Sequence, residues 1–117
     1  MNDLQEIMGS IDYVLKYGGS SSYIVNLKNK INNLDTDTKL FILSEIPLSI
    51  QFMCENQSEE FLLEVVEFFP QLFKYFANNT TEKVCISAIK KNVINFNYII
   101  NPSLLLYDLY LSLCNNE

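Results

Sequence analysis

Apolar residues recur at helical spacing from the start of the chain. Between residues 4 and 15 they return every three or four positions and form one stripe, which predicts an amphipathic helix ending at Gly18-Gly19. The stripe consists of Leu4, Ile7, Met8, Ile11, Val14 and Leu15. A second helix is expected to follow, capped by one of the serines at 20–22 and apolar as far as Leu34. Residues 1–34 are therefore predicted to form an N-terminal helical pair.

A repeat of 23 residues occupies about residues 35–102. Segments 42–53, 65–76 and 88–99 align at this spacing without gaps. The apolar columns are Ile42/Val65/Ala88, Leu43/Val66/Ile89, Ile50/Phe73/Phe96, Phe52/Tyr75/Tyr98 and Met53/Phe76/Ile99. A period of this length holds two short helices and two tight turns, and so small a hairpin buries its apolar face only against its neighbours. The pattern predicts three tandem helical hairpins in a solenoid-like stack.

Polar and proline positions predict where the helices of each unit begin. Thr36, Ser58 and Thr81 precede the first helices and are the expected N-caps. Pro47 and Pro70 share one column and suit the first turn of the second helices, where proline loses no needed hydrogen bond.

The tail resembles half of such a unit. Ser103 is expected to cap an apolar helix over Leu104–Leu113, so that 103–117 closes the stack. The prediction is an all-α fold of one domain, 1–117, made of the segments 1–34, 35–102 and 103–117. The length of 117 residues is close to the common size of a single domain.

Two of these units resemble a family of short repeats. Residues 56–66 and 81–92 are similar to helical-hairpin repeats abundant in giant viruses of amoebae (mimivirus-like) and found in some protists and bacteria, which read roughly N-Q-T-E-E-L-C-x-x-A-V-x-x-N-x-x-A-L-x-Y-V. The best matches are Cys85, Ala88, Ile89, Asn92, Phe96, Tyr98 and Ile99. The middle unit departs at Phe69-Pro70, and the first unit departs more. The resemblance covers about residues 36–102. It implies a fold and a viral or amoebal source, but no active site, because the family has no assigned activity.

The net charge of the chain limits the classes of partner that we expect it to bind. The chain carries 14 acidic residues against 8 basic ones, all lysine, for a net charge of −6. Nucleic-acid binding depends on basic groups that replace phosphate counterions, so nucleic acid is not an expected partner. No apolar run reaches the length of about 18 residues typical of a membrane helix, and the start lacks a signal-peptide pattern. A cytoplasmic protein is expected, in the host cytoplasm or the virion if the chain is viral.

The sequence offers no catalytic or metal-binding set. The three cysteines, Cys54, Cys85 and Cys114, are widely spaced and odd in number, which argues against a disulfide framework. The chain has no histidine, so a thiol would lack its usual base and a zinc ion its usual ligand spacing. The cysteines are expected to be buried structural residues, and no cofactor, metal or enzymatic activity is predicted.

Two surfaces are candidates for binding a protein. Glu60, Glu64 and Glu67 share one helical face, which could meet a basic partner or a cation, although a solvated outer face is the simpler interpretation. Phe68 adds apolar surface beside them, and Leu105 and Leu109 belong to the apolar tail helix. The basic residues Lys83, Lys90 and Lys91 suggest complementary charge between neighbouring hairpins, a solvated edge, or a local phosphate contact.

These features favour a non-catalytic protein–protein interaction module. The partner is expected to be a protein, a basic one if the acidic face is used. The alternative is a structural subunit that self-assembles or packs into a virion or a multi-subunit complex. An enzyme is the third hypothesis, and it would need a carboxylate-only or metal-assisted site.

Overall fold

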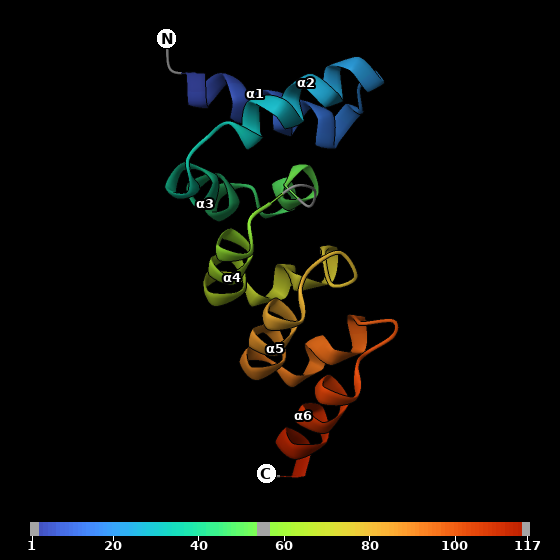
Figure 1. The fold of residues 1–117 in the computed structure, drawn as a ribbon. Helices are drawn as coiled ribbons and strands as arrows, with labels where there is room; N and C mark the ends of the chain where they lie inside the picture. Colours follow the sequence, from blue (N-terminus) through green and yellow to red (C-terminus); the bar gives the residue numbers. More distant parts are fainter. Residues whose placement is uncertain (1–2, 54–56, 116–117) are drawn as a thin grey trace. The chain divides into compact units, whose positions relative to one another are not determined.

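The computed structural model describes residues 3–53 and 57–115, and within these ranges the chain is helical and contains no strand. The prediction of an all-helical fold is confirmed. The elements are α1 (Asp3–Tyr17), α2 (Ser21–Asn32), α3 (Thr36–Glu45), η1 (Pro47–Phe52), α4 (Glu59–Phe68), η2 (Pro70–Tyr75), α5 (Glu82–Lys91), η3 (Val93–Tyr98) and α6 (Leu104–Asn115), where η marks a 3₁₀-helix (Figure 1).

The chain divides into two compact units, Met1–Asn56 and Gln57–Glu117. The first contains α1, α2, α3 and η1, and the second contains the remaining helices. The boundary falls inside the predicted array of 35–102, between its first and second hairpins. A single domain spanning 1–117 therefore stays a prediction.

In the first unit, α1 and α2 pack against each other through the predicted apolar stripes. Ile11 of α1 and Ile31 of α2 have no exposed surface. Gly18 ends α1 with a φ of 77°, a left-handed conformation that glycine adopts without a steric penalty. Ser20 then caps α2 by accepting a hydrogen bond from the backbone N–H of Tyr23 at 3.2 Å. Helices α1 and α2 thus form a packed pair over Asp3–Tyr17 and Ser21–Asn32.

The next six helices follow a common plan. A ten-residue α-helix begins at Thr36, Glu59 and Glu82, and each is followed after one residue by a six-residue 3₁₀-helix. The starting positions recur at the 23-residue spacing of the sequence columns. The predicted second helices are present, but as 3₁₀-helices, and Pro47 and Pro70 stand at their first positions. Whether all three hairpins form one solenoid stack stays a prediction.

The same hydrogen bonds join the two helices of each hairpin. The N–H groups of Ile46, Phe69 and Asn92 donate to the carbonyls of Ile42, Val65 and Ala88 at 2.7, 2.7 and 3.1 Å and close the α-helices. The N–H groups of Ser49, Leu72 and Asn95 then donate to the carbonyls of Ile46, Phe69 and Asn92, each at 2.9 Å. The linking residue leaves helical geometry, with φ near −131°, −137° and −154° in the three hairpins. This non-helical residue turns the chain and starts the three-residue hydrogen-bond ladder of the 3₁₀-helix.

The N-caps follow the 23-residue spacing with one correction. Ser58 and Thr81 accept hydrogen bonds from the N–H groups of Phe61 and Val84, as predicted. The prediction of Thr36 is wrong, because Asp35 caps α3 and accepts from the Thr38 N–H at 2.8 Å. A carboxylate is at least as good an N-cap as a threonine hydroxyl, and Asp35 stands at the position equivalent to Ser58.

Two adjacent columns form the centre of each hairpin. The pairs Ile42-Leu43, Val65-Val66 and Ala88-Ile89 all have no exposed surface. At a later column of the repeat, exposure increases from the first hairpin to the third. Phe52 is 7% exposed, whereas the equivalent Tyr98 is 41% exposed. Size and apolar character alone thus predict burial for the helical pairs and fail for the last aromatic position.

In the second unit the α-helices pack in succession, α4 against α5 and α5 against α6, and η2 lies against η3 (Figure 1). Helix α6 is held by aromatic contacts. The Phe96 ring stacks on Tyr110 with centroids 4.2 Å apart and meets Tyr107 edge-on at 6.0 Å.

At one column of the repeat, the hairpins differ in whether the buried residue is polar or apolar. Ser49, Leu72 and Asn95 are equivalent positions, and all three are buried. The Asn95 amide donates to the carbonyls of Ala88 at 2.9 Å and Pro70 at 3.5 Å, so it joins η3 to both α5 and η2. The Ser49 hydroxyl has no hydrogen-bond partner within residues 3–53 and 57–115.

We expect opposite outcomes from alanine at two positions of this column. Asn95→Ala should lower the free energy of unfolding by roughly 1–3 kcal/mol, because buried carbonyls lose a donor. Ser49→Ala should leave it unchanged or raise it, because a buried hydroxyl without a partner is removed. Urea unfolding followed by circular dichroism measures both. Equal destabilisation by the two substitutions would contradict the assigned hydrogen bonds.

Asp35→Asn is expected to lower the melting temperature at neutral pH but not in strong acid. Hydrogen bonds from the side chain and the N–H of Thr38 lower the pKa of Asp35 below its ordinary value of 3.8. The carboxylate therefore stabilises the fold above that pH, and this contribution is lost as the pH falls through the lowered pKa. Thermal melts across this range test the sign, with Thr36→Ala as the control, since Thr36 does not provide the cap. A difference that is constant with pH would refute the charged cap.

Candidate functional site

The predicted acidic face lies on α4, and its three carboxylates do not share one environment. Glu60, Glu64 and Glu67 are all exposed. Glu67 forms an ion pair with Lys91 of α5, with the charged atoms 2.7 Å apart. No ion pair or side-chain hydrogen bond within the described part of the chain involves Glu60 or Glu64. The available acidic surface is therefore the pair Glu60 and Glu64, one helical turn apart.

The ion pair between Glu67 and Lys91 links neighbouring hairpins. This matches the interpretation of the lysine cluster as complementary charge, although only Lys91 of the three lysines takes part in it. Both side chains are more than one third exposed, and ion pairs of this kind contribute at most about 1 kcal/mol. The ion pair therefore adds little to the stability of the packing between α4 and α5, and its main effect is on how the two helices are aligned.

Phe68 ends α4 with 63% of its surface exposed. It lies one turn after Glu64, so an aromatic ring and carboxylates occupy neighbouring parts of the same helix. A contiguous apolar and charged surface of this type is suited to contact with another protein.

The two residues of α6 that were predicted to bind a partner, Leu105 and Leu109, differ in exposure. Leu105 is 55% exposed, whereas Leu109 is half-buried. The covered side of α6 is centred on Leu106, which is 4% exposed. Leu105 is available to a partner, and Leu109 is so only in part.

Sequence reasoning did not single out three further exposed residues of this helix, Leu104, Tyr107 and Leu111, which are 84%, 47% and 40% exposed. The helix is apolar on most sides, so periodicity alone does not indicate which side faces the protein. Alignment with α5 equates Tyr107 and Leu111 with the buried Cys85 and Ile89, so the sequence alone does not predict their exposure.

A pocket of about 440 Å³ lies where α6 begins. Its lining includes Cys85 and Glu82 of α5 and Ser103, whose hydroxyl donates to the Glu82 carboxylate at 2.6 Å. Burial, and then the nearby Glu82 carboxylate, raise the pKa of the Cys85 thiol. A thiol with a raised pKa is a poor nucleophile at neutral pH, so this pocket is not equipped for thiolate chemistry.

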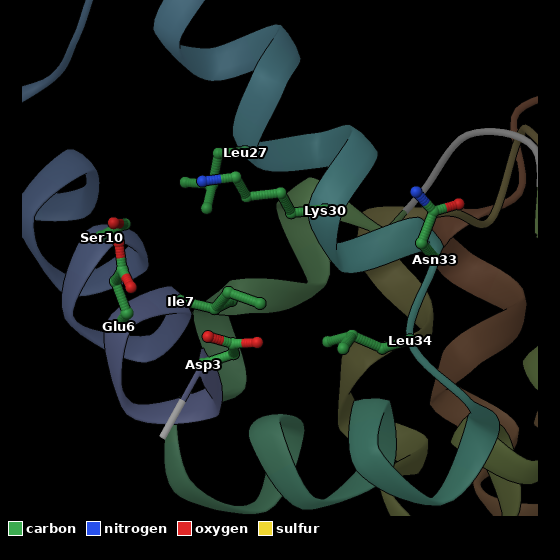
Figure 2. A pocket seen from close by; sticks show the side chains of 8 residues that line it. All are labelled: Asp3, Glu6, Ile7, Ser10, Leu27, Lys30, Asn33 and Leu34. Atoms are coloured by element: carbon green, nitrogen blue, oxygen red, sulfur yellow. The ribbon is translucent and has the colours of Figure 1, made fainter. Parts of the chain in front are cut away.

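A second pocket, of about 380 Å³, lies in the first unit (Figure 2). Figure 2 shows side chains of α1 on one side of it and side chains of α2 and the turn that follows on the other. The lining combines apolar and charged groups: Asp3, Glu6, Ile7, Ser10, Leu27, Lys30, Asn33 and Leu34. Its volume is within the range of small-molecule sites. This mixture of carboxylates, one ammonium group and apolar side chains does not indicate one class of ligand.

Residues 3–53 and 57–115 contain neither a metal-binding cluster of side chains nor a membrane-spanning helix. No three acidic or cysteine side chains in these ranges come together as a metal site. No helix found there is both long and apolar enough to cross a membrane.

The cysteines divide between two environments. Cys85 is buried, as predicted, and Cys114 is exposed, so the prediction of burial is wrong for Cys114. The apolar neighbours of Cys114 in sequence lie on other sides of α6, and sequence neighbours do not determine the exposure of one helix position. Cys54 lies outside the described residues.

Comparison with protein-family models, curated proteins and solved structures finds no match for this chain. The resemblance to the viral repeats stays a prediction.

We predict that iodoacetamide modifies Cys114 much faster than Cys85 in the folded protein. Cys114 is exposed, whereas Cys85 is buried and has a raised pKa. Peptide mass spectrometry over a time course distinguishes the two sites, and the urea-unfolded chain serves as the control in which the rates should converge. Equal rates in the folded protein would show that Cys85 is not buried as described.

Proposed function

We propose that the chain is a non-catalytic protein–protein interaction module built from short helical hairpins. The observation that carries this proposal is the surface of α6, on which leucine and tyrosine side chains are exposed. A helix face with exposed apolar side chains gains free energy when another protein covers it.

The acidic pair on α4 supports the same proposal and suggests a basic partner. Glu60 and Glu64 project charge beside the exposed ring of Phe68. Charges at an interface accelerate association and select partners, while buried aromatic side chains provide most of the affinity. A basic protein segment carrying one apolar residue fits this combination.

The alternative is a structural subunit of a larger assembly, for which the apolar surface of α6 is equally suitable. In that case copies of the chain would cover one another or pack into a virion. The resemblance to repeats of giant viruses leads us to propose a viral or amoebal source, and with it the host cytoplasm or the virion as the location.

A capture experiment tests the interaction module. We expect the immobilised protein to retain one stoichiometric partner from amoebal extract and to lose it in Glu60→Lys/Glu64→Lys. Glu67 is left unchanged, because its replacement would also break the ion pair with Lys91.

The matched control is Asp37→Lys/Glu45→Lys on α3. It makes the same change in charge, and Asp37 occupies the position equivalent to Glu60. Retention of the partner by the control and its loss from the α4 variant would place the interface on α4. Capture of nothing but copies of the chain would instead favour the structural subunit.

A further inference from the structure

The packing of α6 repeats that of α5. Helix α5 packs against α4 and η2, and α6 packs against α5 and η3 in the same way. Each is preceded by a hydroxyl N-cap, Thr81 for α5 and Ser103 for α6. Helix α6 therefore occupies the place of the first helix of another hairpin.

Aligning the two helices at their first residues shows which side of α6 is open. Cys85 of α5 corresponds to Tyr107 of α6, and Ile89 corresponds to Leu111. In α5 these positions are 5% and 0% exposed, and Cys85 lines the pocket at the start of α6 together with Leu106. This is the side of α5 that faces the next helix. The equivalent side of α6 is exposed.

Four residues form this open side, and we name them the α6 outer stripe: Leu104, Tyr107, Asp108 and Leu111. They follow the spacing i, i+3, i+4, i+7, so they share one face. All four are exposed, and Asp108 is the one charged residue of α6. The stripe thus continues the helix-to-helix interface that packs α4, α5 and α6, but has no covering helix within the described ranges.

We infer that the occupant of the α6 outer stripe is the same stripe of a second copy, paired antiparallel about a two-fold axis. This inference rests on the proposed function and specifies its partner at α6. The resulting interface is isologous, as in most homodimers.

The spacing of the stripe is self-complementary. The pattern i, i+3, i+4, i+7 is unchanged when the helix direction is reversed. In the antiparallel pair, Leu104 of one copy therefore faces Leu111 of the other, and Tyr107 faces Asp108. The leucines bury apolar surface at both ends of the interface, and the phenol can donate a hydrogen bond to the carboxylate at its centre.

A second copy also accounts for the lone carboxylate. Asp108 would oppose binding to an uncharged apolar partner, because a desolvated carboxylate needs a donor. Each copy supplies such a donor through Tyr107, whose ring is positioned from the inner side by Phe96. A parallel arrangement would instead place the two Asp108 carboxylates opposite each other.

Sedimentation velocity on the full chain over a concentration series tests this pairing. The wild type should dimerise, and Leu104→Glu and Leu111→Lys should each weaken the dimer about tenfold or more, by placing a charge against a leucine. Both substitutions suit the helix itself, since an acidic residue near its start and a basic residue near its end favour the helix dipole. Val25→Glu, at a side chain 54% exposed on α2, is the control and should not change dimerisation.

An equimolar mixture of Leu104→Glu and Leu111→Lys decides the orientation. In an antiparallel pair the introduced carboxylate faces the introduced ammonium while the remaining two leucines still meet. The mixture should therefore form a heterodimer more stable than either homodimer. If the mixed variants dimerise no more tightly than either variant does alone, the antiparallel pairing is overturned.

A wild type that stays monomeric at every concentration would overturn the self-pairing. The proposed function would survive that result if the captured partner were lost in Leu104→Glu or Glu60→Lys/Glu64→Lys, so the two failures are distinguishable.

Discussion

Burial of one aliphatic pair per hairpin is the constraint on which the structure depends. Ile42-Leu43, Val65-Val66 and Ala88-Ile89 are fully buried, although the α-helices that carry them have only ten residues each. Helices shorter than about 12 residues are marginal alone in water, so their stability comes from packing. A hairpin of this size has too little interior of its own. In the second unit, neighbouring helices pack in succession, α4 against α5 and α5 against α6.

The sequence predicted most of the local structure because local signals determine it. Gly18 marked the end of α1, Ser58 and Thr81 marked the helix starts, and Pro47 and Pro70 marked the second helices. The 3₁₀ geometry was not predictable, since it depends on the backbone conformation of one non-helical residue between the helices. Asp35 and Thr36 are adjacent residues that both suit an N-cap, and only the backbone distinguishes them.

The candidate site was less predictable because it depends on contacts between hairpins. Spacing placed Glu67 with Glu60 and Glu64, but the packing of α5 pairs Glu67 with Lys91. In α6, periodicity could not separate Leu105 from Leu109, since leucines occur on several sides. The covered side was determined by Phe96, a residue of another element. A binding surface left over after packing can be identified only once the packing is known.

Hydrogen exchange by NMR tests the recurring hairpin most directly. The N–H groups of Ile46, Phe69 and Asn92 close the three α-helices, and those of Ser49, Leu72 and Asn95 start the 3₁₀-helices. The account predicts slowed exchange at these six amides, so that protection recurs every 23 residues across the chain. Protection confined to one hairpin, or a pattern without this period, would contradict it.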